Sequence, residues 1–355
     1  MKACFALPLL LALSIAKATF AEDEPAIDGK KLSEWVRELK EGEFKQSMAA
    51  AAALGRMGKD AKAAVPEIIA AFKGKKDMVK WNAVHAVAAI AQVCPEARTA
   101  LVEATKDKEA SVREAAVMAI RDAGPEAKDT TPAVVAALAD ENSKVRERAA
   151  EALLALDADP KIAAPALMAL MTDSDRGVCE RVGEALGKMA RESEVVRTAL
   201  TEKLKDKTPR VRAVAAGALG AAGPKAVSAL PVLLETLGDI DSEVREWTVF
   251  AVGRIGPEAK DAVPVLSEMV KKEEVKIRRA AAYALAGIGP AAKDSVPALI
   301  VALKDAKDGR LRYVAAFALG AIGPDAKEAI PALTEAKKDA SAGVAATEAL
   351  AKIQK

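Results

Sequence analysis

A motif recurs about every 33 residues from Gln46 to the C-terminus of this chain. One copy, at residues 244–257, reads VREWTVFAVGRIGP. Successive copies start 33 residues apart seven times, then 34 and finally 31 residues apart. A fixed period of this size predicts a stacked array of similar units and not a globular domain with one core. The copies start at Gln46, Val79, Val112, Val145, Val178, Val211, Val244, Ile277, Leu311 and, more weakly, Ala342.

Each copy predicts two helices. With the first residue as position zero, apolar residues recur at positions four, seven, eight and eleven, which form one face of an amphipathic helix. A Gly-Pro pair ends this helix at Gly256-Pro257, Gly289-Pro290 and Gly323-Pro324, because glycine accepts the left-handed backbone of a C-terminal cap and proline prevents continuation. A proline at position 20 marks the first turn of a second helix, where proline is tolerated. This proline stands at Pro66, Pro132, Pro165, Pro231, Pro264, Pro297 and Pro331.

Two copies lack the proline at position 20, since Thr99 and Thr198 stand there. We expect these copies to be the weakest internal layers of the array. An aspartate precedes most copies, and an arginine follows their first residue, so we expect an Asp–Arg ladder together with helix capping. The ladder residues are Asp107, Asp140, Asp173, Asp206 and Asp239 with Arg113, Arg146, Arg212, Arg245, Arg278 and Arg312.

Residues 1–21 have the pattern of a secretory signal peptide. Lys2 precedes an apolar run, and small residues follow that run. We expect cleavage after Ala21, with Ala18 as the second choice, and a short N-terminal membrane anchor as the alternative.

Between this segment and the array lie residues 22–45. Leu32, Trp35, Val36 and Leu39 form an apolar face in an otherwise charged stretch. We therefore expect a helix that caps the first layer, followed by the array at residues 46–355.

The charge balance gives the chain no general attraction for nucleic acid or anionic lipid. The chain has 53 Lys and Arg against 51 Asp and Glu, and cleavage would remove Lys2 and Lys17. No later stretch approaches 18 uninterrupted apolar residues, so we expect no integral membrane segment in the mature chain. Cys94 and Cys179 lie three repeats apart, too far for a disulfide, and we expect two free thiols.

The repeated string resembles the HEAT repeat, in the short form first noted in phycobilin lyases. The match is V-R-x-x-A-A-x-A-L-G-x-I-G-P, nearly complete at residues 211–224, 277–290 and 311–324, and the resemblance covers about residues 31–353. It implies an all-α, right-handed α-solenoid of about ten two-helix repeats. It also implies that the helices beginning with Val-Arg line the concave face.

The enzymatic branches of this family find no matching residues here. Deoxyhypusine hydroxylases hold two irons with repeated His-Glu pairs, whereas this chain has one histidine, His85, followed by Ala86. The sequence has no His/Cys cluster for zinc and no glycine-rich phosphate loop. Export and zero net charge argue against the branch that removes alkylated bases from DNA. We therefore expect no catalysis, no cofactor and no metal.

Positions two, three, six and ten lie off the apolar face and vary most among the copies. Six of the nine aromatic residues after Ala21 occupy positions two, three or six. Phe250, Tyr283 and Phe317 share position six in consecutive copies, so stacking would align them. The aromatic zone comprises Trp247, Phe250, Arg254, Arg279, Tyr283, Tyr313 and Phe317, with Trp81 and His85 on the same stripe near the N-terminus. The acidic zone comprises Glu114, Glu147, Glu151, Glu180 and Glu184.

Aromatic side chains rimmed by arginine are typical of protein interfaces, and ring faces also hold sugars. The alternative is that these bulky residues only fill gaps between adjacent helices. We expect an exported, non-enzymatic scaffold, in the periplasm, the cell envelope or outside the cell, that binds a protein or peptide on its concave face. The alternative function is glycan binding in the cell envelope. An accessory lyase-like factor is a minor alternative.

Overall fold

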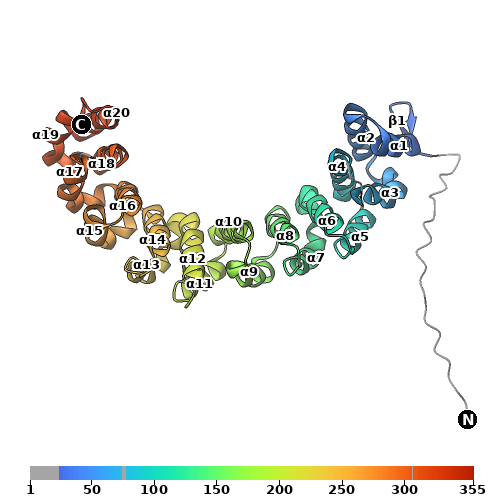
Figure 1. Ribbon diagram of the computed structural model, residues 1–355, viewed down its shortest axis with the longest axis horizontal. Helices are drawn as coiled ribbons and strands as arrows, with labels where there is room; N and C mark the ends of the chain where they lie inside the picture. Colours follow the sequence, from blue (N-terminus) through green and yellow to red (C-terminus); the bar gives the residue numbers. More distant parts are fainter. Residues whose placement is uncertain (1–23, 74–76, 306) are drawn as a thin grey trace, which may run out of the picture. The chain divides into compact units, whose positions relative to one another are not determined.

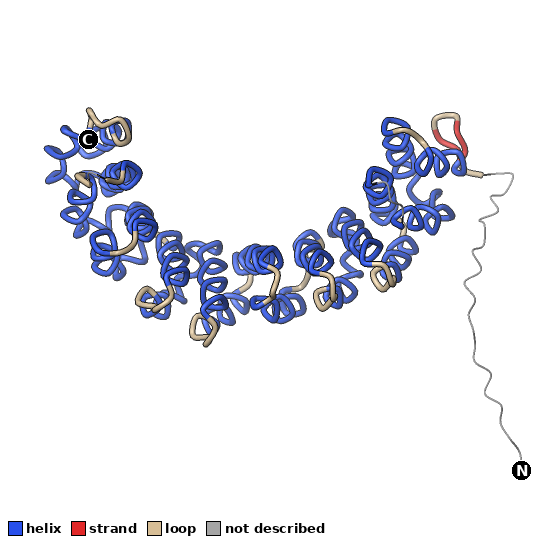
Figure 2. Tube along the Cα trace, in the orientation of Figure 1, coloured by secondary structure: helices blue, strands red, loops and turns tan. Residues whose placement is uncertain are grey.

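Two layers of helices build each part of the chain (Figures 1 and 2). The structure is a computed structural model that describes residues 24–73, 77–305 and 307–355. The signal peptide expected at residues 1–21 lies outside these described residues. The chain divides into a unit ending at Thr130 and a unit from Thr131 to Lys355.

A β-hairpin and a capping helix begin the first unit. Strand β1 (Ala26–Ile27) pairs antiparallel with β2 (Lys30–Lys31). Trp35 of helix α1 (Leu32–Glu41) donates a hydrogen bond from Nε1 to the Ile27 carbonyl oxygen at 3.1 Å. The apolar face expected for α1 is buried, so the hairpin and α1 close the N-terminal end of this unit.

The remaining helices of the first unit alternate between the two layers. The helices that begin a copy of the motif, here called Val-Arg helices, are α2 (Phe44–Met57), α4 (Asp77–Val93) and α6 (Ala110–Ala123). The intervening segments are η1 (Gly58–Ala64), α3 (Val65–Ala70), η2 (Ala71–Lys73), α5 (Pro95–Ala104) and η3 (Gly124–Thr130).

The second unit repeats this arrangement. Within this unit, successive Val-Arg helices pack against one another, and each also packs against the intervening helix that precedes it. The Val-Arg helices are α8 (Ser143–Ala155), α10 (Arg176–Glu192), α12 (Pro209–Ala222), α14 (Ser242–Ile255), α16 (Val275–Ile288), α18 (Gly309–Ile322) and α20 (Gly343–Ile353). The intervening helices are α7 (Thr131–Ala137), α9 (Pro160–Ala169), α11 (Glu194–Lys203), α13 (Leu230–Thr236), α15 (Val263–Lys272), α17 (Val296–Leu303) and α19 (Ile330–Ala336). Short 3-10 segments are η4 (Leu170–Thr172), η5 (Gly223–Ala229), η6 (Pro257–Ala262), η7 (Gly289–Ser295) and η8 (Gly323–Ala329).

The apolar positions of the motif form the core, as predicted. In α18 the residues at positions zero, four, seven, eight and eleven are all at most 1 % exposed. These are Leu311, Ala315, Ala318, Leu319 and Ile322. The fold is thus an all-α solenoid in which each layer covers the apolar face of its neighbour.

The glycine at the end of a Val-Arg helix adopts a positive φ, as predicted, but its ψ differs from the prediction. Gly256 has φ 86° and ψ −143°, which lies outside the left-handed helical region and in a region that only glycine enters readily. Any side chain at this position would therefore strain the backbone.

The proline at position 20 begins the second helix in most repeats, for example at Pro231 in α13. The prediction is wrong for Pro165, which lies inside α9, because that helix already begins at Pro160. In the repeat that starts at Val178, no Gly-Pro pair stops the first helix. Helix α10 therefore runs on to Glu192, and Ser193 then caps α11 by accepting from the Val196 amide.

The Asp–Arg ladder is present in the second unit. Arg212 donates from Nε and Nη2 to the Asp239 carboxylate, at 2.6 and 2.8 Å, and from Nη1 to the Asp206 carbonyl oxygen at 2.9 Å. Each such arginine therefore joins the loop before its own helix to the loop before the next one. Glu273 replaces the aspartate opposite Arg245. The other rungs are Arg146–Asp173, Arg278–Asp305 and Arg312–Asp339.

Two further features of the core bear on the sequence predictions. Cys94 and Cys179 are both free and buried.

Two helical runs, Pro209–Thr236 and Val275–Leu303, are long and apolar enough to cross a membrane. Each run is a pair of repeat helices, and half of its apolar window is buried within the array.

Candidate functional site

A trough runs over α12 in the second unit, between side chains of α10 and α14. Its volume is about 480 Å³. The floor is formed by Ala213, Val214, Gly217, Ala218 and Ala221 of α12. Cys179, Glu180, Gly183 and Glu184 line it from α10, and Trp247 and Phe250 line it from α14. Arg176, Arg210 and Glu243 lie at the end where these three helices begin.

The trough exists because α12 carries short side chains where its neighbours carry long ones. At positions three and six, α12 has Val214 and Gly217, whereas α14 has Trp247 and Phe250. The backbone of all three helices follows the same repeat, so only the difference in side-chain length lowers the floor. These floor residues were missed by the sequence analysis, although their small size is readable in the repeat that starts at Val211.

The aromatic wall of the trough is half-exposed. Trp247 is 41 % and Phe250 is 42 % exposed, and their ring centroids lie 5.7 Å apart in an edge-to-face arrangement. Each ring also rests on a glycine of α12: a Cβ built on Gly217 would lie 3.1 Å from Trp247 Cε3, and one on Gly220 would lie 2.7 Å from Phe250 Cδ1. The rings are therefore held on one side by packing and face solvent on the other.

The opposite wall carries two carboxylates one helical turn apart. Glu180 pairs with Arg176 at 2.9 Å, and Glu184 pairs with Arg181 at 2.7 Å. Their side chains nevertheless remain 61 % and 58 % exposed. A carboxylate has about four lone-pair positions, so both groups can accept further hydrogen bonds from the trough side.

The rest of the acidic zone in the second unit is an ion-pair network and not an array of unpaired acids. Glu147 pairs with Lys144 at 2.8 Å, and the hydrogen bond from Lys144 lowers the pKa of Glu147. Glu151 pairs with Arg148 at 3.0 Å, and Arg181 bridges to Glu151 at 3.2 Å. The charge that the sequence analysis assigned to this zone is therefore largely neutralised within the protein.

The aromatic zone separates into two pairs. Tyr283 and Phe317 form the second pair, with centroids 6.3 Å apart, and Tyr313 nearby on α18 is 39 % exposed. Among the described residues, Phe250 and Tyr283 make no ring contact, so the expected continuous row of rings is interrupted between α14 and α16.

The two arginines assigned to the aromatic zone have different surroundings. Arg279 donates to the Asp308 carboxylate, the N-cap of α18, at 2.7 to 3.2 Å, and this bond lowers the pKa of Asp308. Arg279 is therefore a structural group. Arg254 is exposed and forms no ion pair with any residue in the described part of the chain.

The predicted residues of the first unit lie apart from this site along the chain. Trp81 is 42 % exposed on α4. His85, one turn further, is also exposed and places Nδ1 3.6 Å from Asp122 Oδ2. Glu114 is half-buried on α6.

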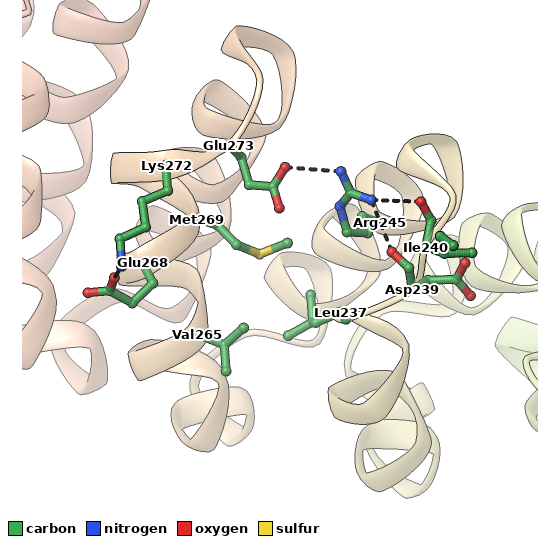
Figure 3. Close-up of a pocket in the computed structure, with 10 residues that line it drawn as sticks. Leu237, Asp239, Ile240, Arg245, Val265, Glu268, Met269, Lys272 and Glu273 are labelled. Atoms are coloured by element: carbon green, nitrogen blue, oxygen red, sulfur yellow. Dashed lines mark hydrogen bonds and ion pairs between the residues drawn. The ribbon is translucent and has the colours of Figure 1, made fainter.

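A second hollow of about 590 Å³ is lined by the loop that joins α13 to α14, by Arg245 of α14 and by α15 with Glu273 at its end (Figure 3). Arg245 at its edge donates to the carbonyl oxygens of Asp239 and Ile240, at 3.0 and 3.2 Å, and to Glu273 at 3.0 Å. The arginine is thus a rung of the Asp–Arg ladder, and the hollow is part of the scaffold. Within the described residues, no group of three or more His, Cys, Asp or Glu side chains could hold a metal ion.

Comparisons with known proteins point to one family. A sequence model of HEAT repeats matches residues 33–121, 101–187, 131–215, 196–286 and 270–351. No curated protein matches the chain.

Similar solved structures include the karyopherin Kap121p bound to the extreme C-terminus of the protein phosphatase Cdc14p, with a TM-score of 0.67 at 16 % identity. That match covers 94 % of this chain and 42 % of Kap121p. Yeast importin-beta (Kap95p) matches with a TM-score of 0.65 at 14 % identity, over 91 % of this chain and 50 % of that one. The chain thus spans half or less of the length of these structures, and at these identities the likeness concerns the fold.

Proposed function

The chain belongs to the HEAT-repeat family, and on that premise we propose that it is an exported, non-enzymatic scaffold that binds a protein or peptide on the face formed by its Val-Arg helices. The observation that supports this proposal most is the trough over α12, where half-exposed Trp247 and Phe250 stand opposite Glu180 and Glu184. A small-residue floor between an aromatic and a polar wall is a suitable recess for the anchoring side chains of a partner.

The structural neighbours support a protein partner. In two of them, Kap121p is bound to the extreme C-terminus of Cdc14p and Kap95 is in a complex with Nup1. Those proteins use a solenoid of the same kind in complexes with other proteins. We infer that this chain also serves as a platform for a protein ligand, with a different partner.

Export is a separate part of the proposal and rests on residues 1–21, which precede the described residues. If the signal peptide is removed as proposed, the mature protein begins at Glu22. Mass spectrometry of the protein from its native cells tests this directly. A mature chain that retains Lys2 would contradict cleavage.

The binding face is tested by replacing Phe250 and Tyr283 with alanine. Both rings are about 40 % exposed, so their removal should leave the helix content unchanged while weakening capture of the native partner. Val301→Ala on α17 is the control, because Val301 is 59 % exposed on an intervening helix. Unchanged capture by the double variant would contradict the assigned face.

Glycan binding is the second candidate, because the half-exposed rings of the aromatic zone, including Trp247 and Phe250 in the trough, could stack on sugars. Trp247 lies in the trough, so its fluorescence should report a bound sugar there. Quenching by one member of a sugar panel, absent in a Trp247→Phe variant, would favour this function over protein binding.

A further inference from the structure

We infer that the junction between α10 and α12 is a hinge, which opens at the end where these two helices begin and is held together at the end where they stop. The inference concerns a motion of the chain itself and does not depend on which partner the trough binds. It follows from a missing rung of the Asp–Arg ladder, from the position of the contacts that remain, and from the packing of small residues between the two helices.

The Asp–Arg ladder is interrupted at this junction. In four rungs of the second unit the arginine pairs with an aspartate 27 residues further on, as Arg212 does with Asp239. Asp206 stands at the equivalent place, 27 residues after Cys179, but a cysteine occupies the position of the arginine. The Cys179 thiol donates only to the segment before its own helix, for example to the Asp173 carbonyl oxygen at 3.3 Å. The acceptor of this rung is therefore present and its donor is missing.

The loops before α10 and α12, residues 173–175 and 204–208, are consequently not tied to each other. Asp206 pairs instead with Lys203 at the end of α11, at 3.6 Å, and accepts the Thr208 amide of its own loop at 2.9 Å. Within the described residues, no hydrogen bond or ion pair joins these two loops. From α8 onward, every other pair of successive Val-Arg helices has a rung that joins the corresponding loops.

The polar contacts that do join the two layers lie at the opposite end of the helices. Arg191, in the last turn of α10, donates from Nε to the Ala221 carbonyl oxygen at 2.9 Å. The next residue, Glu192, pairs with Lys225 at 3.0 Å. Two layers that are joined at one edge and not at the other open about the joined edge, so these contacts mark the pivot.

Small residues make the packing between α10 and α12 closer at the pivot than toward the untied end. A Cβ built on Gly187 would lie 2.8 Å from the Cβ of Ala221, too close for a side chain, so the two helices nearly touch there. One turn earlier, a Cβ on Gly183 would meet Val214 Cγ1 at an ordinary contact distance of 3.5 Å. The contact between the helices thus loosens away from the pivot, as a hinge requires.

Opening of this junction changes the shape of the trough, because the trough spans it. Glu180 and Glu184 belong to α10, whereas the floor belongs to α12 and the aromatic wall to α14. The junction between α12 and α14 keeps its rung, Arg212–Asp239, and the ring of Phe250 packs on α12. The floor and the aromatic wall therefore stay together, and the carboxylate wall moves away from them when the hinge opens.

The two free cysteines allow this motion to be measured in the unmodified chain. The Cys179 residue is 4 % exposed at the untied end, and Cys94 is 1 % exposed in the first unit. A buried thiol reacts only when the structure around it opens. The measurement is the rate at which iodoacetamide alkylates each cysteine without denaturant, followed by mass spectrometry of the peptides.

We expect alkylation of Cys179 to be about tenfold faster than that of Cys94 and to change little at low urea concentrations, as local opening does. Arg191→Ala removes a contact at the pivot and should accelerate the reaction of Cys179 about fivefold. Arg312→Ala, which breaks a rung far from this junction, should leave the rate unchanged.

A second measurement restores the missing rung. Cys179→Arg places a guanidinium 27 residues before Asp206, as in the neighbouring rungs, and Cys179→Val is the control that removes the thiol without adding a donor. We expect hydrogen exchange of the Asp175 and Thr208 amides, one in each loop, to slow about tenfold in the arginine variant alone.

Equal exchange in the arginine and valine variants would overturn the hinge. So would alkylation of Cys179 only at urea concentrations that unfold the whole chain, a result that decides the matter even if the arginine variant does not fold. Neither result bears on whether the trough binds a protein, which the capture experiment with Phe250 and Tyr283 tests separately.

Discussion

At the scale of single residues, glycines of α12 let the aromatic wall lie close to the helix. A Cβ on Gly220 would come within 2.7 Å of Phe250 Cδ1 and 3.0 Å of Ala251 Cα. The exposed rings are thus neither free surface groups nor pure gap fillers. They are packed on glycine along one edge and presented to solvent along the other.

Gly220→Ala should therefore destabilise the protein by about 1–3 kcal/mol, because Phe250 or the helix α14 must shift to admit the methyl group. The measurement is the urea midpoint, followed by circular dichroism. Gly238→Ala is the matched control, since a Cβ there would make an ordinary contact of 3.6 Å with the Glu235 carbonyl oxygen. Equal midpoints for the two variants would refute the close contact.

The Asp–Arg ladder predicts a dependence of stability on pH. The hydrogen bond from Arg212 lowers the pKa of Asp239 in the folded protein. The ionised Asp239 carboxylate therefore stabilises the folded protein fully at pH values above about 3.9, the pKa of an aspartate in an unfolded chain. This stabilisation is lost as the pH falls through the lower pKa that Asp239 has in the folded protein. Asp239→Asn should cost about 2 kcal/mol at pH 7, and its stability should approach that of the wild type on acidification.

Urea unfolding at pH 7 and at a series of values below pH 4 measures this difference. Asp325→Asn serves as a control, because the Asp325 carboxylate forms no ion pair with any described residue. A difference between Asp239→Asn and the wild type that stays constant with pH would show that the bond with Arg212 does not stabilise the fold through its charge.

At the scale of elements, the N-cap of α14 fixes the helix that carries the aromatic wall. Asp241 accepts hydrogen bonds from the amides of Glu243 and Val244 at 2.9 and 3.1 Å. Asp241→Ala should cost about 1 kcal/mol, whereas Asp241→Asn should retain most of the cap. Hydrogen exchange of these two amides is the readout, and unchanged protection in the alanine variant would contradict this role of the cap.

The elements could largely be predicted from the sequence, because the apolar positions recur from layer to layer and a Gly-Pro pair ends the first helix in five of the copies. The β-hairpin was missed, although Asp28-Gly29 between two short extended runs is a hairpin signal. Asp28 and Gly29, at the turn of this hairpin, have φ angles of 53° and 76°. The expectation that the layers containing Thr99 and Thr198 are the weakest stays a prediction, which hydrogen exchange in α5 and α11 can test.

The candidate site was only half predictable. Its walls were identified as two separate zones, since Glu180 and Glu184 precede Trp247 and Phe250 by two repeats. The trough depends on a difference in side-chain length between three adjacent helices, and small residues such as Gly217 carry no chemical signal on their own. Ion pairs such as Arg181–Glu184 could not be predicted either, because long side chains reach several partners.

At the scale of the whole molecule, stability should be distributed, because each layer is covered mainly by its neighbours. Removing residues 330–355, which include α19 and α20, should lower the thermal midpoint, since α18 loses the helix packed against it. Binding in the trough should persist, because α10, α12 and α14 retain both of their neighbouring layers. Loss of trough binding in a truncated chain that is still helical would contradict this local picture.

The central claim is that the trough over α12 holds a protein partner in the cell. A photo-crosslinking amino acid at Val214, compared with the same group at Val301, tests it most directly. The account predicts a discrete protein adduct from position 214 that disappears when Trp247 and Phe250 are replaced by alanine, and no such adduct from position 301. The same adducts from both positions, or none from 214 while the protein is in its native cells, would contradict the assignment of this trough as the binding site.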